Sequence, residues 1–183
     1  MKMKVLFTII LISSFTQVKA QKGNNSISIN GEVGLPLDQA GLGLGFFFKT
    51  FYGIGKSAQL TLSFGAAFFR PNNPNQVGQM STREIPFLVG YRQNIGRFYV
   101  EPQIGFGELG GKRSIGGDFA RPSAPAVYGE VSIGYFYKHF DFGIEYRIAH
   151  GVDNTSVGYW PNQNFQSVSF HIGFIIAHKS RNH

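Results

Sequence analysis

Apolar and polar side chains alternate along most of this chain from Ile27 onward, in eight separate segments. The segments are 27–35, 41–49, 59–68, 84–92, 98–107, 127–137, 140–149 and 167–177. In the clearest segment, the large apolar residues of one face oppose the small or charged residues of the other: Phe140, Phe142, Ile144, Tyr146 and Ile148 against Asp141, Gly143, Glu145, Arg147 and Ala149. A period of two predicts β-strands, and no stretch has a convincing helical repeat. The pattern therefore predicts an all-β protein.

The sizes of the side chains decide which face lies outside. Eight such strands form either a soluble barrel or sandwich with the apolar face inside, or a membrane barrel with that face toward lipid. The apolar face is full of Phe, Tyr, Ile and Leu, and the interior of an eight-stranded barrel holds only a limited set of side chains. The other face is rich in Gly, Ser and Ala, which suits a narrow lumen. We therefore predict an eight-stranded antiparallel up-and-down transmembrane β-barrel.

The lengths of the connections support the same topology. Three connections are short, at 53–57, 94–97 and 138–139, and they alternate with long ones rich in Gly, Pro and Asn, at 70–81, 109–124 and 151–164. The first outer connection, 36–40, is the exception because it is also short. Outer-membrane barrels have short periplasmic turns and longer outer loops. With an even number of strands, both termini are expected on the periplasmic side.

The first twenty residues are expected to direct export. Lys2 and Lys4 precede an apolar run over 5–12, and the segment ends in Val18, Lys19 and Ala20. A basic start, a short apolar region and small residues at the last and third-last positions are typical of a secretory signal peptide. The run is too short for a membrane-spanning helix, which needs about 20 apolar residues. We predict a signal peptide over 1–20, cleaved near Ala20, and an outer-membrane barrel domain over 21–183.

Composition narrows the function classes. The 183 residues carry a net charge of +7, but the predicted signal peptide removes three lysines, which leaves 14 basic and 10 acidic residues and a charge of +4. No basic run with interleaved aromatic residues is present, so nucleic acid is not an expected partner. The absence of Cys excludes disulfides, thiolate metal sites, a Cys nucleophile and a lipid-modified N-terminal Cys. We expect no cofactor and no metal.

Charged residues fall on the face that is predicted to line the lumen. They are Glu32, Lys49, Glu84, Arg92, Glu101, Glu130, Asp141, Glu145 and Arg147, with His171 as a further candidate cation. An unpaired buried charge costs several kcal/mol, so these groups should form ion pairs that plug the barrel. The alternative is an ion path or a carboxylate active site.

Aromatic and basic residues near the predicted strand ends are candidates for contacts with lipid. The candidate aromatic girdles are Phe46, Phe47, Phe48, Phe51, Tyr52, Phe68, Phe69, Tyr135, Phe136 and Tyr137, with Trp160 in the last outer loop. The basic residues in or beside the outer loops are Arg70, Arg83, Lys112, Arg113 and Arg121. Outer-membrane lipid and the phosphates of lipopolysaccharide are therefore expected partners, although scattered surface charge explains the basic residues equally well.

Two adjacent segments and the late strands resemble a known family. The stretch EIPFLVGYRQNIGRFYVEPQIGFG, at 84–107, and the later strands YGEVSIGYFY and FDFGIEYRI are similar to the small outer-membrane β-barrel proteins of Bacteroidota, the porin-like or OmpA-like barrels. Such barrels usually end in an aromatic residue, whereas here Phe174 is followed by IIAHKSRNH. The resemblance implies the fold and an outer-membrane location, but no activity.

A second resemblance would make the protein an enzyme. The segments YRIAHGVDN and WPNQNFQS are similar to those of lipid A 3-O-deacylases, outer-membrane hydrolases with a His-x-Ser-Asn sequence and a later Glu. The resemblance places His150 in the base position, and strand parity points it outward. The nucleophile position holds Val152 or, with a one-residue shift, Asp153, and the acidic position holds Gln166. A His without a hydroxyl nucleophile and an orienting carboxylate cannot run Ser-type acyl transfer.

Two functions therefore stay open. The first is a monomeric outer-membrane barrel with a plugged lumen and a structural or surface-interaction role, mediated by long outer loops that bind an unknown ligand. The second is a lipid A 3-O-deacylase or an inactive relative of it.

Overall fold

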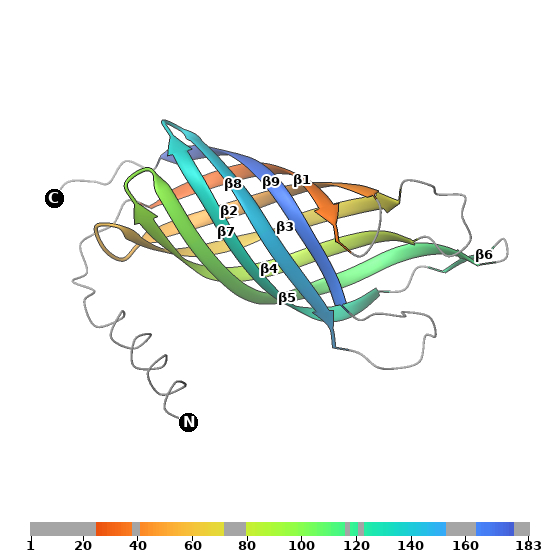
Figure 1. Cartoon of the computed structure of the whole chain (residues 1–183). Helices are drawn as coiled ribbons and strands as arrows, with labels where there is room; N and C mark the ends of the chain where they lie inside the picture. Colours follow the sequence, from red (N-terminus) through yellow and green to blue (C-terminus); the bar gives the residue numbers. More distant parts are fainter. Residues whose placement is uncertain are drawn as a thin grey trace, which may run out of the picture.

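Nine strands occur in the described part of the chain, and eight of them close into a barrel (Figure 1). The computed structural model describes residues 25–37, 41–71, 80–115, 118–120, 123–152 and 164–177. The strands are β1 (Ser26–Pro36), β2 (Gly41–Gly53), β3 (Ala58–Pro71), β4 (Met80–Ile95), β5 (Phe98–Ile115), β6 (Asp118–Ala120), β7 (Ser123–Tyr137), β8 (Phe140–Gly151) and β9 (Asn164–Ala177). The predicted eight-stranded antiparallel barrel is confirmed. Within these residues, no helix is long and apolar enough to cross a membrane.

The barrel closes because the last strand, β9, pairs with the first, β1. A path through directly paired residues starts at Ser26 on β1, passes Thr61, Gln103 and Arg147, and returns to β1 at Pro36. The path ends ten residues farther along β1 than it began. In an eight-stranded barrel, this stagger inclines the strands by about 40° to the barrel axis. The interior of such a barrel is just wide enough for side chains.

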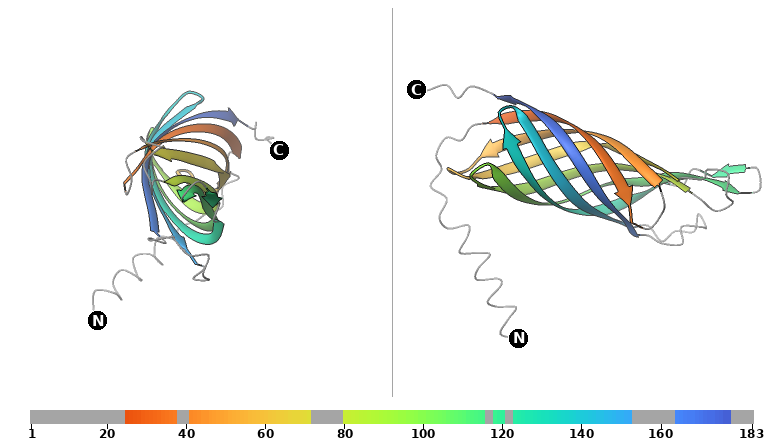
Figure 2. Two further views of the ribbon diagram at one scale, coloured as in Figure 1. Left: turned by 90° about the vertical axis from the view of Figure 1, so that its right-hand side faces the viewer. Right: turned by 45° about the horizontal axis from the view of Figure 1, so that its top comes forward.

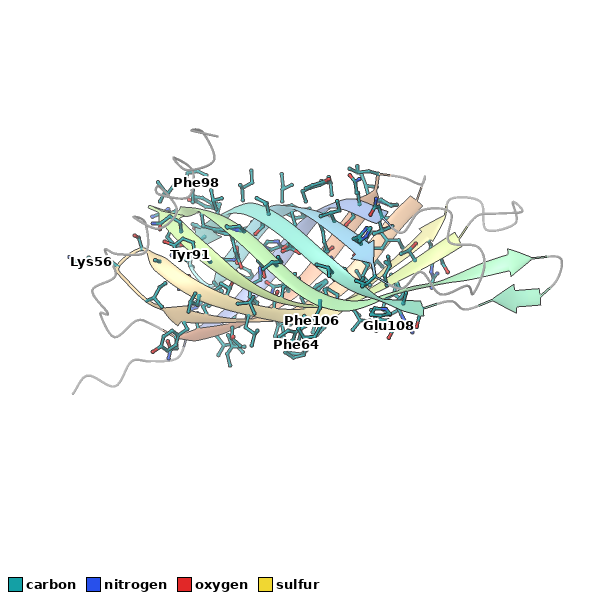
Figure 3. The ribbon with its side chains drawn as sticks, turned by 90° about the horizontal axis from the view of Figure 1, so that it is seen from below. Lys56, Phe64, Tyr91, Phe98, Phe106 and Glu108 are labelled. Atoms are coloured by element: carbon teal, nitrogen blue, oxygen red, sulfur yellow. The ribbon has the colours of Figure 1, made fainter. Side chains whose placement is uncertain are left out.

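The alternating residues of each strand form the two faces of the barrel wall. Large apolar side chains point outward all around it; Phe64 and Phe106, for example, are 49% and 66% exposed and lie on the outside (Figure 3). The residues between them point into the lumen and are buried, as the strictly alternating burial of β1 and β8 shows. The outer face is therefore apolar and the charged residues lie inside.

The two ends of the barrel differ in length and pairing. At one end β1 begins, β9 ends, and three short turns join β2 to β3, β4 to β5 and β7 to β8 (Figures 1 and 2). At the other end β5, with 18 residues, continues beyond the barrel and pairs with β6. We call these the short-turn end and the loop end.

The expected loop over 109–124 is wrong in its extent. The strand β5 runs to Ile115, the short β6 pairs with it, and β7 begins at Ser123. The ladder continues because backbone hydrogen bonds do not require alternating side chains, so Gly110 and Gly111 still pair with β4. The predicted signal peptide, most of the loops 70–81 and 151–164, and Trp160 lie outside the described residues.

Candidate functional site

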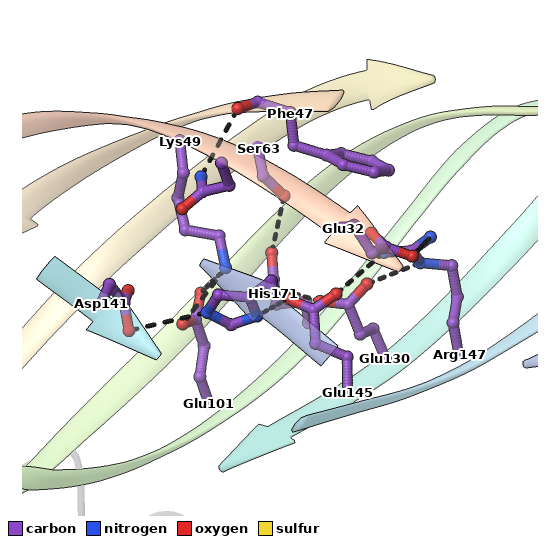
Figure 4. Close-up of polar contacts among 12 residues, drawn as sticks. Glu32, Phe47, Lys49, Ser63, Glu101, Glu130, Asp141, Glu145, Arg147 and His171 are labelled. Atoms are coloured by element: carbon purple, nitrogen blue, oxygen red, sulfur yellow. Dashed lines mark hydrogen bonds and ion pairs between the residues drawn. The ribbon is translucent and has the colours of Figure 1, made fainter. Parts of the chain in front are cut away.

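The nine charged residues predicted for the lumen all lie inside the barrel. None of them is more than 5% exposed, and His171, the further candidate cation, is 2% exposed. With His171 they come from seven different strands, and the stagger of the barrel brings them into one connected network. Figure 4 shows the part of it around Arg147 and His171. Two arginines, Arg147 and Arg92, form its centres.

Arg147 on β8 contacts four carboxylates. Its guanidinium donates to Glu32 through two nitrogens, at 3.1 and 3.3 Å. Its nitrogens also lie close to carboxylate oxygens of Glu130 at 2.7 Å, Glu145 at 3.1 Å and Glu84 at 3.3 Å. The guanidinium also lies 4.7 Å from the centre of the Phe47 ring. Several acceptors fit one Arg because its planar guanidinium presents five N–H donors.

Arg92 on β4 is held by two carboxylates and by aromatic rings. Its Nη2 lies 2.5 Å from Glu101 Oε2, and its Nη1 donates to Asp141 Oδ2 at 3.0 Å. The guanidinium lies 3.7 Å from the centre of the Tyr99 ring and 4.5 Å from that of Phe51. Arg92 is fully buried, so ion pairs and rings replace the water that it would otherwise bind.

His171 on β9 connects the two centres. Its Nδ1 lies 2.6 Å from Glu145 Oε1, next to Arg147. Its Nε2 lies 3.1 Å from the Tyr99 hydroxyl and 3.6 Å from Asp141 Oδ1, next to Arg92. One imidazole therefore joins both halves of the network across the lumen (Figure 4).

The network also contains a lysine and neutral side chains. Lys49 Nζ lies 3.4 Å from Glu101 Oε1. Gln103 donates to Glu130 at 2.7 Å and accepts a hydrogen bond from Ser63 at 2.8 Å. Among the described lumen residues, six carboxylates face three permanent cations and His171, so the interior has an excess of acidic groups.

The remaining space in the network is small. A cavity beside Arg147 is lined by Asn30, Glu32, Phe47, Lys49, Ser63, Glu130, Glu145, Arg147 and His171. It has room for about one water molecule. Within the described residues, no cluster of three or more His, Cys, Asp or Glu could hold a metal ion. The carboxylates that converge in the lumen instead form ion pairs with Arg147 and Arg92.

The loop end of the lumen is apolar, which the charged residues on the inner face did not predict. A cluster of buried side chains fills it, composed of Phe47, Ala67, Phe69, Leu88, Leu109, Ala126, Tyr128, Ala149 and Phe165. The rings of Phe69 and Phe165 meet at 4.9 Å. Strand parity could have identified these residues. Each lies an even number of positions from a charged lumen residue on its own strand, or is paired with a residue that does.

Four residues assigned to the aromatic girdles face the lumen instead. Phe47, Phe51 and Phe69 are 6%, 3% and 3% exposed and lie inside, and Phe136 packs against Tyr99 beneath Arg92. Their assignment to the girdles was wrong because it followed their position near strand ends and ignored parity. Other girdle candidates do face outward: Phe46, Tyr52, Phe68 and Tyr137 are exposed.

The basic residues beside the loops differ in their surroundings. Arg70 is exposed at the end of β3. Arg83 forms an ion pair with Glu108 on the outer face, with both side chains about two-fifths exposed. The side chains of Lys112 and Arg113, and the whole of Arg121, lie outside the described residues.

His150, the candidate base, lies on the outer face near the loop end. Its Nδ1 contacts the side-chain oxygen of Asn164 on β9. Nearby, the Tyr146 hydroxyl donates to Gln166 Oε1 at 2.7 Å. The His therefore has an amide as its partner, and Gln166 is bound to a tyrosine. Asp153, one of the residues at the nucleophile position, lies outside the described residues.

Comparisons with known proteins bear on the fold. No protein-family model and no curated protein matches the chain. Among solved structures, the attachment invasion locus protein Ail of Yersinia pestis aligns with a TM-score of 0.57 and 15% identity, over 85% of this chain and 100% of that one. The N-terminal β-barrel domain of Pseudomonas aeruginosa OprF aligns with a TM-score of 0.56 and 12% identity, over 84% and 99%.

The outer-membrane enzyme PagL is also similar in structure. It aligns with a TM-score of 0.51 and 11% identity, over 80% of this chain and 98% of that one. All three alignments cover nearly the whole of the other chain, so the resemblance extends over the complete barrel. At these identities it shows the fold alone: this chain has the fold of small eight-stranded outer-membrane barrels.

Proposed function

We propose that the protein is an outer-membrane β-barrel with a plugged lumen and a structural or surface-interaction role. The outer face is the observation that carries the membrane location, because large apolar side chains are exposed all around the barrel. In water this surface would be a large aggregation-prone patch, whereas in lipid it is the expected exterior. The fold shared with outer-membrane barrels supports the same location.

The packing of the lumen supports a plug. The ion-pair network fills the middle, the apolar cluster fills the loop end, and the cavity within the network beside Arg147 holds about one water molecule. An ion would have to displace several buried pairs to pass. We expect no steady conductance when the protein is reconstituted in a planar bilayer, and a stable open channel would contradict the plug.

A surface role is supported by the loop end. There β5 and β6 extend beyond the barrel as a hairpin (Figures 1 and 2). With a signal peptide over 1–20 and the short turns in the periplasm, this hairpin would face the cell exterior. One protein of the same fold is named for attachment and invasion, and we propose a comparable surface contact here, with a ligand that binds the loops.

One substitution distinguishes a lipid-facing exterior from a water-facing one. Ile133 points outward and is 55% exposed, four residues before the turn that ends β7. This places it about 10 Å along the axis, near the middle of an apolar belt about 25 Å tall. In lipid, Ile133→Lys should lower the free energy of unfolding by about 2–4 kcal/mol. In water, the same exposed substitution would change it by less than about 0.5 kcal/mol.

The measurement is urea unfolding of the protein folded in phospholipid vesicles. Phe98→Lys is the matched control, because Phe98 is 64% exposed but lies next to a short turn, where a lysine should cost about 0–1 kcal/mol. Equal, negligible costs at both positions would contradict the membrane location. A freely soluble periplasmic protein that migrates identically before and after boiling would contradict it as well.

A lipid A 3-O-deacylase, active or inactive, is the second candidate. It is favoured by the contact between His150 and Asn164, which orients an imidazole on the outer face where an acyl chain in lipid can reach it. An amide can orient a catalytic His, as in Cys-His-Asn proteases.

For an active enzyme, mass spectrometry should show lipid A lacking one ester-linked acyl chain in cells with the wild-type protein. The loss should disappear with His150→Gln and persist with the outward control Val127→Gln. Unchanged lipid A in wild-type cells would contradict activity.

A further inference from the structure

The three short turns each carry one cation and no acidic residue. They contribute Lys56 between β2 and β3, Arg97 between β4 and β5, and Lys138 between β7 and β8. All three side chains are exposed. The described carboxylates lie elsewhere: six are inside the lumen, and Glu108 is on the outer face toward the loop end, paired with Arg83. Among the described residues, the three turns at the rim of the short-turn end therefore carry positive charge and no negative charge.

The cations are spread around the rim and do not form a patch. The strand order places the β2–β3, β4–β5 and β7–β8 hairpins side by side around the barrel. The remaining sector is the one where β1 begins and β9 ends. Because the three cations lie on three separate hairpins, they fit a layer that surrounds the barrel better than a single partner bound at one side.

Two of the three cations lie beside aromatic side chains. Arg97 Nη1 donates to the Tyr135 hydroxyl at 3.3 Å, and Lys138 Nζ lies 5.4 Å from the centre of the Tyr137 ring. Phe98 and Lys56 lie at the same end of the barrel (Figure 3). Aromatic rings with polar edges settle at the level of lipid headgroups. The cations are thus at the height where headgroup phosphates would be.

Lys138 occupies a backbone position that suits glycine better. The β4–β5 and β7–β8 hairpins both have two-residue turns, since Ile95 pairs with Phe98 and Tyr137 pairs with Phe140. The first turn residue has φ 66° in Gly96 and φ 56° in Lys138. Glycine adopts this conformation without steric cost, and a lysine does not. Turn geometry therefore does not explain the lysine, whereas a role for its charge does.

We propose that this positive rim binds anionic phospholipid headgroups of the membrane leaflet that surrounds the short-turn end. The proposal rests on the membrane location proposed above. Lys56, Arg97 and Lys138 would contact headgroup phosphates by charge-assisted hydrogen bonds, while the neighbouring rings sit at the boundary with the acyl chains. The contribution expected of one surface cation corresponds to about a fivefold change in lipid association.

The test compares lipid preference in three forms of the full-length mature protein. Each is reconstituted in nanodiscs of equimolar phosphatidylglycerol and phosphatidylcholine, and the lipids retained on release are counted by native mass spectrometry. The rim variant combines Lys56→Gln, Arg97→Gln and Lys138→Gln. The control combines Arg70→Gln, Lys112→Gln and Arg113→Gln, whose backbone lies at the loop end.

Wild type should retain phosphatidylglycerol in preference to phosphatidylcholine, the rim variant should lose this preference by up to about 100-fold in the ratio of association constants, and the control should lose less than the rim variant. High salt should weaken it in the wild type. An unchanged preference in the rim variant, or an equal loss in the control, would overturn the proposal. So would rim-dependent binding of a soluble polyanion without any lipid preference, which would identify an anionic polymer or protein as the partner.

Lys138→Gly tests the effect of the charge on lipid association separately from the stability of the barrel. Glycine removes the steric cost of the positive φ at this turn, so the barrel should unfold at the same or a higher urea concentration. Association with phosphatidylglycerol should nevertheless fall about fivefold. Undiminished association in this variant would contradict the role of Lys138. Insertion is checked for every form by the shift in gel migration on boiling. Failure to insert would count against the membrane location, whereas insertion without lipid preference counts against the rim proposal alone.

Discussion

On the outer face of the barrel, the β5 side chains of Ile104 and Phe106 are about two-thirds exposed. On the inner face of the same strand, Glu101 and Gln103 are buried and form hydrogen bonds with Arg92 and Glu130. The outer side chains need only be apolar and fill the belt. The inner side chains must match one another in charge, length and position, because no water replaces a lost partner. The inner face should therefore be far more sensitive to single substitutions than the outer face.

Arg147→Ala should produce the largest effect. It removes the cation shared by Glu32, Glu84, Glu130 and Glu145 and leaves buried carboxylates without a partner. Breaking a buried ion pair in this way typically costs about 3–5 kcal/mol. Urea unfolding in phospholipid vesicles measures the loss.

Arg147→Lys is the matched variant for this prediction. A lysine keeps the charge but has no planar fork for two oxygens of Glu32, so its loss should be smaller than that of Arg147→Ala. A stability equal to wild type in Arg147→Ala would show that the network does not hold the barrel together.

Glycine substitutions test the same contrast without charge. A Cβ added at the inward Gly105 would lie 1.9 Å from the carbonyl oxygen of Phe87 on the neighbouring strand, so the backbone would have to move. A Cβ at the outward Gly31 would meet no atom within 4 Å. Gly105→Ala should cost about 1–3 kcal/mol as overpacking, and Gly31→Ala should be neutral or slightly stabilising. Equal effects of the two substitutions on the urea midpoint would contradict the contrast.

Sequence periodicity predicted the faces of the barrel but not the contacts across it. Parity alone placed Glu32 and Arg147 on the inner face. Their contact, between residues 115 positions apart, depends on the ten-residue stagger that closes β9 on β1, and no local pattern contains that number. The pairing of His150 with Asn164 likewise depends on the register of β8 and β9.

Errors arose where a second rule competed with parity. Phe51 and Phe69 lie near strand ends, which favoured the girdles, but their parity turns them into the lumen. The extension of β5 to Ile115 was missed for the opposite reason, since its ladder continues through Gly110 and Gly111 where side-chain alternation has stopped. Backbone pairing and side-chain pattern thus end at different residues.

Arg83→Ala should have the smallest effect among the charge substitutions and gives the sharpest comparison with Arg147→Ala. Both substitutions remove an arginine that is paired with glutamate, but Arg83 and Glu108 are 43% and 39% exposed on the outer face near the loop end. Solvent and headgroups screen this pair and can replace either partner, so the loss should be below about 1 kcal/mol. The same unfolding measurement applies, with Glu108→Gln as the reciprocal variant. If Arg83→Ala cost as much as Arg147→Ala, burial would not be what separates the two faces, and the chemistry of the ion pair itself would have to explain both.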